Sequence, residues 1–145
     1  MDTFSTNREP YQSLLASAHS AYDEGDYKVA VILAQTAVEV FTEKTLGQLY
    51  HRRDIAYLKP EFENLLINYN LGNAKVSGLY MALADDNINQ QSFWKAFTDH
   101  VGLRNDLVHD GADATADQAA VSLKVVGQII GHITDHLAAP QKVPV

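Results

Sequence analysis

The chain contains no cysteine and no long apolar run. Without cysteine among its 145 residues, it can form neither a disulfide framework nor a thiolate metal site. No stretch approaches the roughly 20 apolar residues that a membrane-spanning helix needs. The N-terminal residues Met1–Ser5 have neither the basic start nor the apolar middle of a secretion signal. We therefore expect a cytoplasmic protein with no membrane partner.

Basic residues are also few. The chain has 11 Lys and Arg against 18 Asp and Glu, which gives a net charge of −7 at pH 7. Non-specific binding to nucleic acid usually depends on a basic surface that releases counterions. We therefore expect no DNA partner, and any RNA site must be local. Arg52 and Arg53, which follow His51, either contact an RNA backbone or form the basic end of a helix, where cations are favourable.

Several motifs of common enzymes are missing. The sequence has no Gly-rich phosphate loop, no zinc-protease motif and no nucleophile elbow, which removes most nucleotide hydrolases and esterases. We expect no cofactor. With 46% hydrophobic residues, the chain can bury the core of a single domain. The prediction is one domain over residues 1–145, ordered from about 8 to 138, with 139–145 as a loose tail.

Apolar residues recur at helical spacing along almost the whole chain. This spacing predicts four main helices, over about 11–22, 27–49, 89–108 and 116–137. Asp26 and Thr115 are predicted N-caps. Two short helices lie between the second and third, one from Pro60 to Gly72 and one after Asn73. The predicted fold class is all-α, an up-and-down four-helix bundle with one or two short extra helices.

The segment Arg104-Asn105-Asp106-Leu107-Val108-His109 carries the most chemistry. Arg can hold a phosphate through a planar fork of donors, and His can move a proton near neutral pH. Together these groups are able to cleave RNA without a metal. Arg104 lies on the inward stripe and needs an anion, from Glu39, Asp99, Asp106 or a bound phosphate. The competing interpretation is that Arg and His only cap carbonyls and pair with acids.

His109 follows Arg104 by five residues. In a continuous helix, five residues turn a side chain about 140° away. Either the helix ends between Asp106 and His109 so that His109 swings round, or a symmetric homodimer brings Arg104 of one chain beside His109 of the other. We favour the dimer.

The segment RNDLVHDG resembles the signature of HEPN domains, an Arg with a polar residue directly after it and then a His within a few residues. The second helix is similar too, since Glu24-Gly25-Asp26-Tyr27 is followed by an apolar run and by Val38-Glu39. The match is sharp at about 24–46 and 104–111. The resemblance implies a helical bundle that dimerises through the motif-bearing helices. In catalytic members it also implies a metal-independent endoribonuclease, many of which are toxins paired with an antitoxin or act in phage defence.

The resemblance also implies roles for three residues. Arg104 would bind the scissile phosphate, and His109 would be the general base on the ribose 2′-hydroxyl or the acid to the leaving oxygen. Asn105 would orient His109 or the phosphate. One toxin branch has a Tyr two residues past the His, which its antitoxin modifies, whereas this chain has Gly111 there. Other members have no demonstrated catalysis, so the alternatives are a dimerisation or interaction module and a nucleotide-binding bundle.

Neighbouring polar residues have two interpretations each. Glu39 either pairs with Arg104 and fixes its fork or faces solvent at a helix edge. His100, one turn before Arg104, is interpreted as an inner His with satisfied hydrogen bonds, the alternative being a catalytic role. His132 and His136 either face solvent near the end of the last helix or hold zinc, although no third ligand is evident.

Two further groups have structural interpretations. Phe93, Trp94 and Phe97 are interpreted as core side chains and not as a platform for stacking bases. Residues 85–89 are interpreted as a polar loop with capping residues, because they lack the Gly and distal Glu of a calcium loop.

Overall fold

The computed structural model describes residues 8–139, and this part of the chain is entirely helical, with no strand. The prediction of an all-helical protein is confirmed. The elements in chain order are α1 (Pro10–Asp23), α2 (Tyr27–Arg52), η2 (Ala56–Leu58), α3 (Lys59–Leu65), α4 (Ala74–Ala84), η3 (Ile88–Gln90), α5 (Trp94–His109) and α6 (Ala116–Ala138). Apart from Ala139, the predicted loose tail lies outside the described residues. Within residues 8–139, every helix is too short or too polar to pass through a bilayer.

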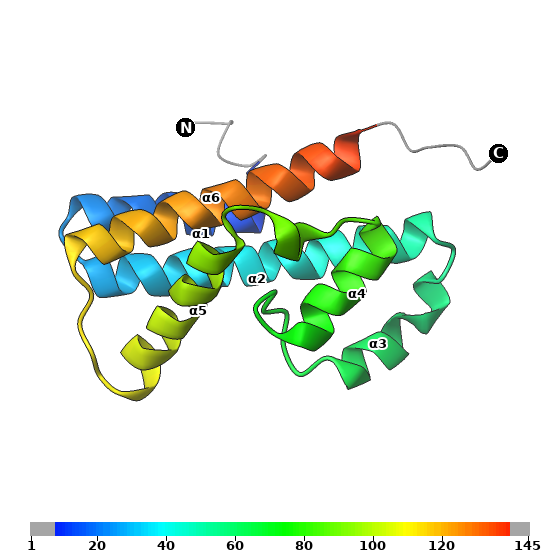
Figure 1. Cartoon of the computed structure of the whole chain (residues 1–145), viewed down its shortest axis with the longest axis horizontal. Coiled ribbons are helices and arrows are strands. Elements are labelled where there is room, and N and C mark those ends of the chain that lie inside the picture. Colours follow the sequence, from blue (N-terminus) through cyan, green and yellow to red (C-terminus); the bar gives the residue numbers. More distant parts are fainter. Residues whose placement is uncertain (1–7, 140–145) are drawn as a thin grey trace.

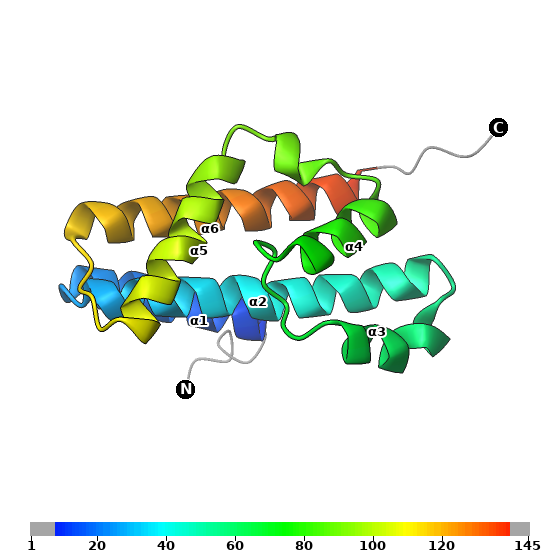
Figure 2. The same cartoon turned by 60° about the horizontal axis from the view of Figure 1, so that its bottom comes forward.

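The helices α1, α2 and α6 run side by side along the long axis, and α5 crosses obliquely over α2 and α6 (Figures 1 and 2). α2 is central, since it contacts α1, α4, α5 and α6. Its buried residues therefore lie on more than one face, as the broad apolar surface of its sequence indicates. The short helices α3 and α4 connect α2 to α5 around one end of the molecule (Figure 1).

The predicted starts of three helices are confirmed by their capping contacts. The Asp26 side chain accepts a hydrogen bond from the Val29 N–H at the start of α2, and Asn73 accepts one from Lys75 at the start of α4. Thr115 accepts from the Gln118 N–H at 3.1 Å, and the Gln118 side chain accepts from the Thr115 N–H in return. This capping box begins α6.

The helix that begins near Pro60 is shorter than predicted. It ends at Leu65, with Leu66 in an extended conformation, whereas the sequence placed its end at Gly72. Leu65 is also 66% exposed and not on an inner face. The physical reason is local competition for backbone donors. The Asn68 and Asn70 side chains each accept a hydrogen bond from the backbone N–H two residues on, a turn geometry that replaces the helix.

Buried apolar residues form two clusters of unequal size. The main cluster joins α1, α2, α4, α5 and α6, and it includes Phe97, with Phe93 and Trp94 packed against it. The interpretation of these aromatics as core is confirmed. The smaller cluster lies where α5 ends and α6 begins, and its five buried members are Ala21, Ala30, Val31, Leu107 and Ala119. The C-terminal end of α5 is therefore supported separately from the rest of the core.

The third main helix also begins later than predicted. α5 starts at Trp94, and Ile88–Gln90 form the 3-10 turn η3 in place of its first turn. Ile88 is fully buried, so the segment 85–89 is not simply a solvated polar loop. Its capping role is confirmed at Asp85, which ends α4 in the left-handed conformation at φ 51°.

Candidate functional site

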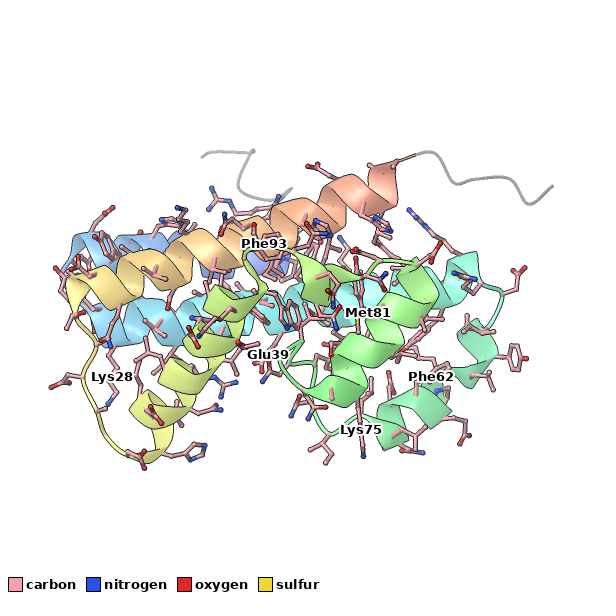
Figure 3. The ribbon with its side chains drawn as sticks, in the orientation of Figure 1. Lys28, Glu39, Phe62, Lys75, Met81 and Phe93 are labelled. Atoms are coloured by element: carbon pink, nitrogen blue, oxygen red, sulfur yellow. The ribbon has the colours of Figure 1, made fainter. Side chains whose placement is uncertain are left out.

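Arg104 projects from α5 toward α2, where Glu39 lies beside the middle of α5 (Figure 3). Its Nη2 donates a hydrogen bond to Glu39 Oε1 at 3.0 Å, and the two side chains are 21% and 26% exposed. The hypothesis that Glu39 pairs with Arg104 is confirmed, and a fully solvated Glu39 is wrong. Asp99 instead pairs with Lys95 at 3.1 Å, and Asp106 is exposed.

The Arg104 guanidinium has more donors than acceptors. It carries five N–H groups, and within residues 8–139 only the bond to Glu39 uses one of them. Its Nε is buried without an acceptor, a condition that costs about 1–3 kcal/mol. A planar oxyanion or phosphate beside this group would gain charge-assisted hydrogen bonds. Arg104 is therefore a half-buried cation that can still accept an anion.

His109 is the last residue of α5 and is exposed. In the described part of the chain its side chain has no hydrogen-bond partner. α5 ends at His109, inside the predicted range of Asp106 to His109, but His109 itself is still helical. The side chains of Arg104 and His109 therefore leave the helix about 140° apart. The predicted swing of His109 toward Arg104 is not formed, so one protomer does not aim both groups at one phosphate. Asn105 is exposed on the same helix.

His100 lies one turn before Arg104 and is 3% exposed. Gln35 Nε2 donates to Asn70 Oδ1 at 3.2 Å, which leaves Gln35 Oε1 to accept from His100 Nε2 at 3.0 Å. His100 Nδ1 then accepts from the Ser122 hydroxyl at 2.7 Å. Burial, reinforced by the positive charge of Arg104, lowers the pKa of His100 to about 4. His100 is therefore a neutral inner histidine with both ring nitrogens satisfied.

The hydrogen bonds from Ser122 to His100 and from His100 to Gln35 resemble those of a catalytic nucleophile and its base, but the site is closed to substrate. Ser122 is 1% exposed, so no substrate reaches its hydroxyl. No functional role was predicted from the sequence for Gln35, Asn70 or Ser122. The signal for two of them was a polar side chain on an otherwise apolar helix face, since Gln35 and Ser122 are buried in α2 and α6. These groups join α2, α5, α6 and the segment 66–73 beside Arg104.

Arg52 and Arg53 cap the C-terminal ends of α6 and α4, respectively. Arg52 Nη1 donates to the Leu137 carbonyl oxygen at 3.0 Å, at the end of α6. Arg53 Nε and Nη2 both donate to the Leu83 carbonyl oxygen, at 3.0 and 2.8 Å, at the end of α4. Cations that cap C-terminal carbonyls also favour the negative end of the helix dipole. These contacts favour the helix-end interpretation over contact with RNA.

Within residues 8–139, His132 and His136 neither face solvent freely nor belong to a group of metal ligands. His132 Nε2 donates to both carboxylate oxygens of Asp86, at 2.9 and 3.1 Å, and His136 Nε2 donates to the Ala84 carbonyl at 2.7 Å. The Tyr80 hydroxyl donates to the same buried carboxylate at 2.7 Å. Among residues 8–139, no three His, Asp or Glu side chains are grouped to hold a metal. Both interpretations were wrong because the Ala84 carbonyl at the end of α4 and the Asp86 carboxylate just after it lie within hydrogen-bonding distance of these two histidines.

An open groove of about 510 Å³ lies between the N-terminal end of α1, the C-terminal half of α2 and η2. Its charged lining is mixed, with Lys44 and Lys59 beside Glu9 and Glu43, and Lys44 is already paired with Glu9 at 2.6 Å. Neither Arg104 nor His109 lines this groove. The groove is therefore separate from the Arg–His segment.

The chain matches no known protein-family model, and no curated protein or solved structure was found to match it. The resemblance to HEPN domains consequently rests on the residues of segments 24–46 and 104–111 alone.

Proposed function

We propose that this protein is a HEPN-like, metal-independent endoribonuclease that acts as a homodimer in the cytoplasm, of the toxin or phage-defence kind. The observation that carries the proposal is the Arg104 guanidinium. It is half-buried, it has unused donors, and it shares one helix with the exposed His109. A phosphate diester offers the acceptors that this group lacks.

The chemistry divides between the two side chains. Arg104 binds the non-bridging oxygens of the scissile phosphate and stabilises the negative charge that grows there. His109 takes the proton of the ribose 2′-hydroxyl, whose oxygen then attacks phosphorus. The P–O5′ bond breaks, and the leaving oxygen receives a proton from the His109 of the second chain. The products are a 2′,3′-cyclic phosphate and a 5′-hydroxyl. Asn105, next to Arg104, orients the phosphate or the imidazole.

Two chains are needed because of the helical geometry. Arg104 and His109 diverge by about 140° within one α5. A twofold axis beside this helix would bring Arg104 of one protomer beside His109 of the other and would form one shared cleft. The exposed Asn105, Val108 and His109 would contribute to the dimer face. The four helices of this proposed HEPN-like bundle are α1, α2, α5 and α6, with α5 crossing obliquely and with α3 and α4 as additions (Figure 1).

The acidic composition limits how RNA is bound. With a net charge of −7, the affinity would come from the shared cleft, where two copies of Arg104 gather, and not from a basic surface. The Arg52 and Arg53 side chains donate hydrogen bonds to carbonyl oxygens at helix ends. A partner such as an antitoxin would control access to this cleft.

The decisive experiment is RNA cleavage by His109→Ala in the presence of EDTA. We expect the parent to cleave single-stranded RNA and the variant to lose at least about 100-fold in rate, as loss of a general acid–base does. His19→Ala is the matched control, because His19 is also exposed on a helix but lies on α1. If His109→Ala cleaves as fast as the parent, the proposed mechanism is wrong.

A second candidate is a non-catalytic dimerisation or interaction module. The Arg104–Glu39 ion pair favours it, because the pair ties α5 to α2 as a structural contact would. On this hypothesis, Arg104→Ala lowers the free energy of unfolding, and no variant or parent cleaves RNA. Thermal-shift measurements with nucleotides would test the third alternative, a nucleotide-binding bundle.

A further inference from the structure

The ion pair between Arg104 and Glu39, beside the proposed cleft, leaves most of its hydrogen-bonding groups without a partner. Arg104 reaches Glu39 through a single hydrogen bond, from Nη2 to Oε1. Within residues 8–139, the second oxygen of Glu39 has no hydrogen-bond donor, and Arg104 Nε has no acceptor. An Arg and a carboxylate pair most strongly through two parallel bonds. The two groups are therefore close but not optimally paired.

We propose that Glu39 is an internal competitor for the anion site, so that a phosphate diester must displace its carboxylate from Arg104. In the absence of RNA, the Glu39 carboxylate then occupies the phosphate-binding guanidinium of Arg104. This inference rests on the proposed role of Arg104 in binding phosphate, but it does not require cleavage. It assigns Glu39 an inhibitory contact and not a step in the chemistry.

Replacing Glu39 by a phosphate at Arg104 should require little free energy. The pair is partly open to solvent, at 21% and 26% exposure, and such ion pairs are weak. A phosphate that bridges Nη1 and Nη2 would replace one hydrogen bond by two, because Nη1 also has no acceptor among residues 8–139 and, unlike Nε, is not buried. The released Glu39 side chain, already about a quarter exposed, can turn to water.

α5 stays attached to α2 during this exchange. The second polar link between the two helices is the hydrogen bond from His100 Nε2 to Gln35 Oε1, which lies one turn away from the ion pair. It involves no charge and is buried. Displacement of Glu39 therefore frees the guanidinium without releasing the helix that carries it.

The test measures binding in a background that cannot cleave. His109→Ala is combined with Glu39→Gln, and the affinity for a single-stranded RNA oligonucleotide is measured by fluorescence anisotropy in EDTA. The matched control is Glu43→Gln, since Glu43 is an exposed acid one turn along α2 and pairs with no cation in the described residues. Both changes remove one negative charge from the same helix.

We expect Glu39→Gln to tighten RNA binding about three- to fivefold, the size expected for loss of a weak competing ion pair. Glu43→Gln should tighten it less than about twofold, because Glu43 is exposed and does not contact Arg104. The proposal is overturned if Glu39→Gln binds no more tightly than Glu43→Gln, or binds more weakly.

A second measurement begins with the unaltered protein, so its first result does not depend on the folding of any variant. Inorganic phosphate is titrated into the unaltered protein while the Arg104 Nε–H resonance is followed by NMR. We expect this resonance to shift, and to do so at lower phosphate concentration in Glu39→Gln. An Nε–H resonance that phosphate leaves unmoved overturns the proposal.

Failure of this inference differs from failure of the nuclease proposal. If RNA is cleaved through His109 but Glu39→Gln changes nothing, the competitor role is wrong and the nuclease stands. If phosphate shifts Arg104 and Glu39→Gln sharpens that response but RNA is never cleaved, the anion site stands and the nuclease is wrong.

Discussion

Acid should destabilise this protein through His100, in a way that can be calculated. In the folded chain the pKa of His100 is lowered from 6.5 to about 4, first by burial and then by the charge of Arg104. The unfolded chain therefore binds the proton at a pH where the folded chain does not, so stability falls as the pH drops below about 6.5 and stops falling near pH 4. Between pH 7.5 and pH 5, these two pKa values give a loss of about 2 kcal/mol from this residue alone.

The assay compares the parent with His100→Gln, whose amide can still bond to Ser122 and Gln35 but does not titrate. Denaturant unfolding at pH 7.5 and pH 5 gives the free energy of unfolding of both proteins. Every other titrating group is common to the two, so the difference between their pH-dependent losses isolates His100. We expect the parent to lose about 2 kcal/mol more than the variant. Equal losses in the two proteins would refute the account of a buried neutral histidine.

Further predictions concern stability and are read from denaturant unfolding at pH 7.5. Tyr80→Phe removes a hydroxyl that donates to the buried Asp86 carboxylate, so we expect a loss of about 1–3 kcal/mol, and an unchanged midpoint would contradict this contact. Thr115→Ala removes the N-cap of α6 and should cost about 1 kcal/mol, whereas parental stability would mean that the cap contributes nothing. Gly111→Ala places a Cβ at φ +67° and should cost about 1 kcal/mol, and a stabilised variant would show that the turn adopts another conformation. His109→Ala should remain within about 0.5 kcal/mol of the parent, because His109 is exposed, and a larger loss would assign it a structural role.

Helix starts were predictable because their causes are local. Asp26, Asn73 and Thr115 each accept a hydrogen bond from a backbone N–H two or three residues on, so a short window of sequence contains both partners. The end of α3 was not predicted, although its cause is also local. Asn68 and Asn70 formed turns where apolar spacing suggested that a helix continues.

The candidate site was partly predictable. Helical spacing placed Arg104 on the inward stripe, and Glu39 was one of several acids considered for it. The contacts of His100 and His132 could not be predicted, because their partners lie far away in sequence. His100 bonds to Gln35, 65 positions away, and His132 bonds to Asp86, 46 positions away. Such pairings depend on how the helices cross, which apolar periodicity alone does not specify.

The same limit applied to the basic residues near the end of α2. Two adjacent arginines in a sequence indicate positive charge. They do not indicate which hydrogen-bond acceptors the fold places near them. Arg52 and Arg53 found carbonyl oxygens at the ends of α6 and α4, 85 and 30 positions away. The two guanidinium groups that the sequence suggested for RNA binding therefore link the end of α2 to the ends of α6 and α4.

The separate small cluster beneath the end of α5 has a dynamic consequence. Leu107 packs there with four small or medium apolar residues, whereas Phe97 packs in the main core. Local opening costs least where few apolar contacts are lost. The backbone amides of the last two turns of α5 should therefore exchange with deuterium before those around Phe97, and this end of the helix can shift while the core remains closed.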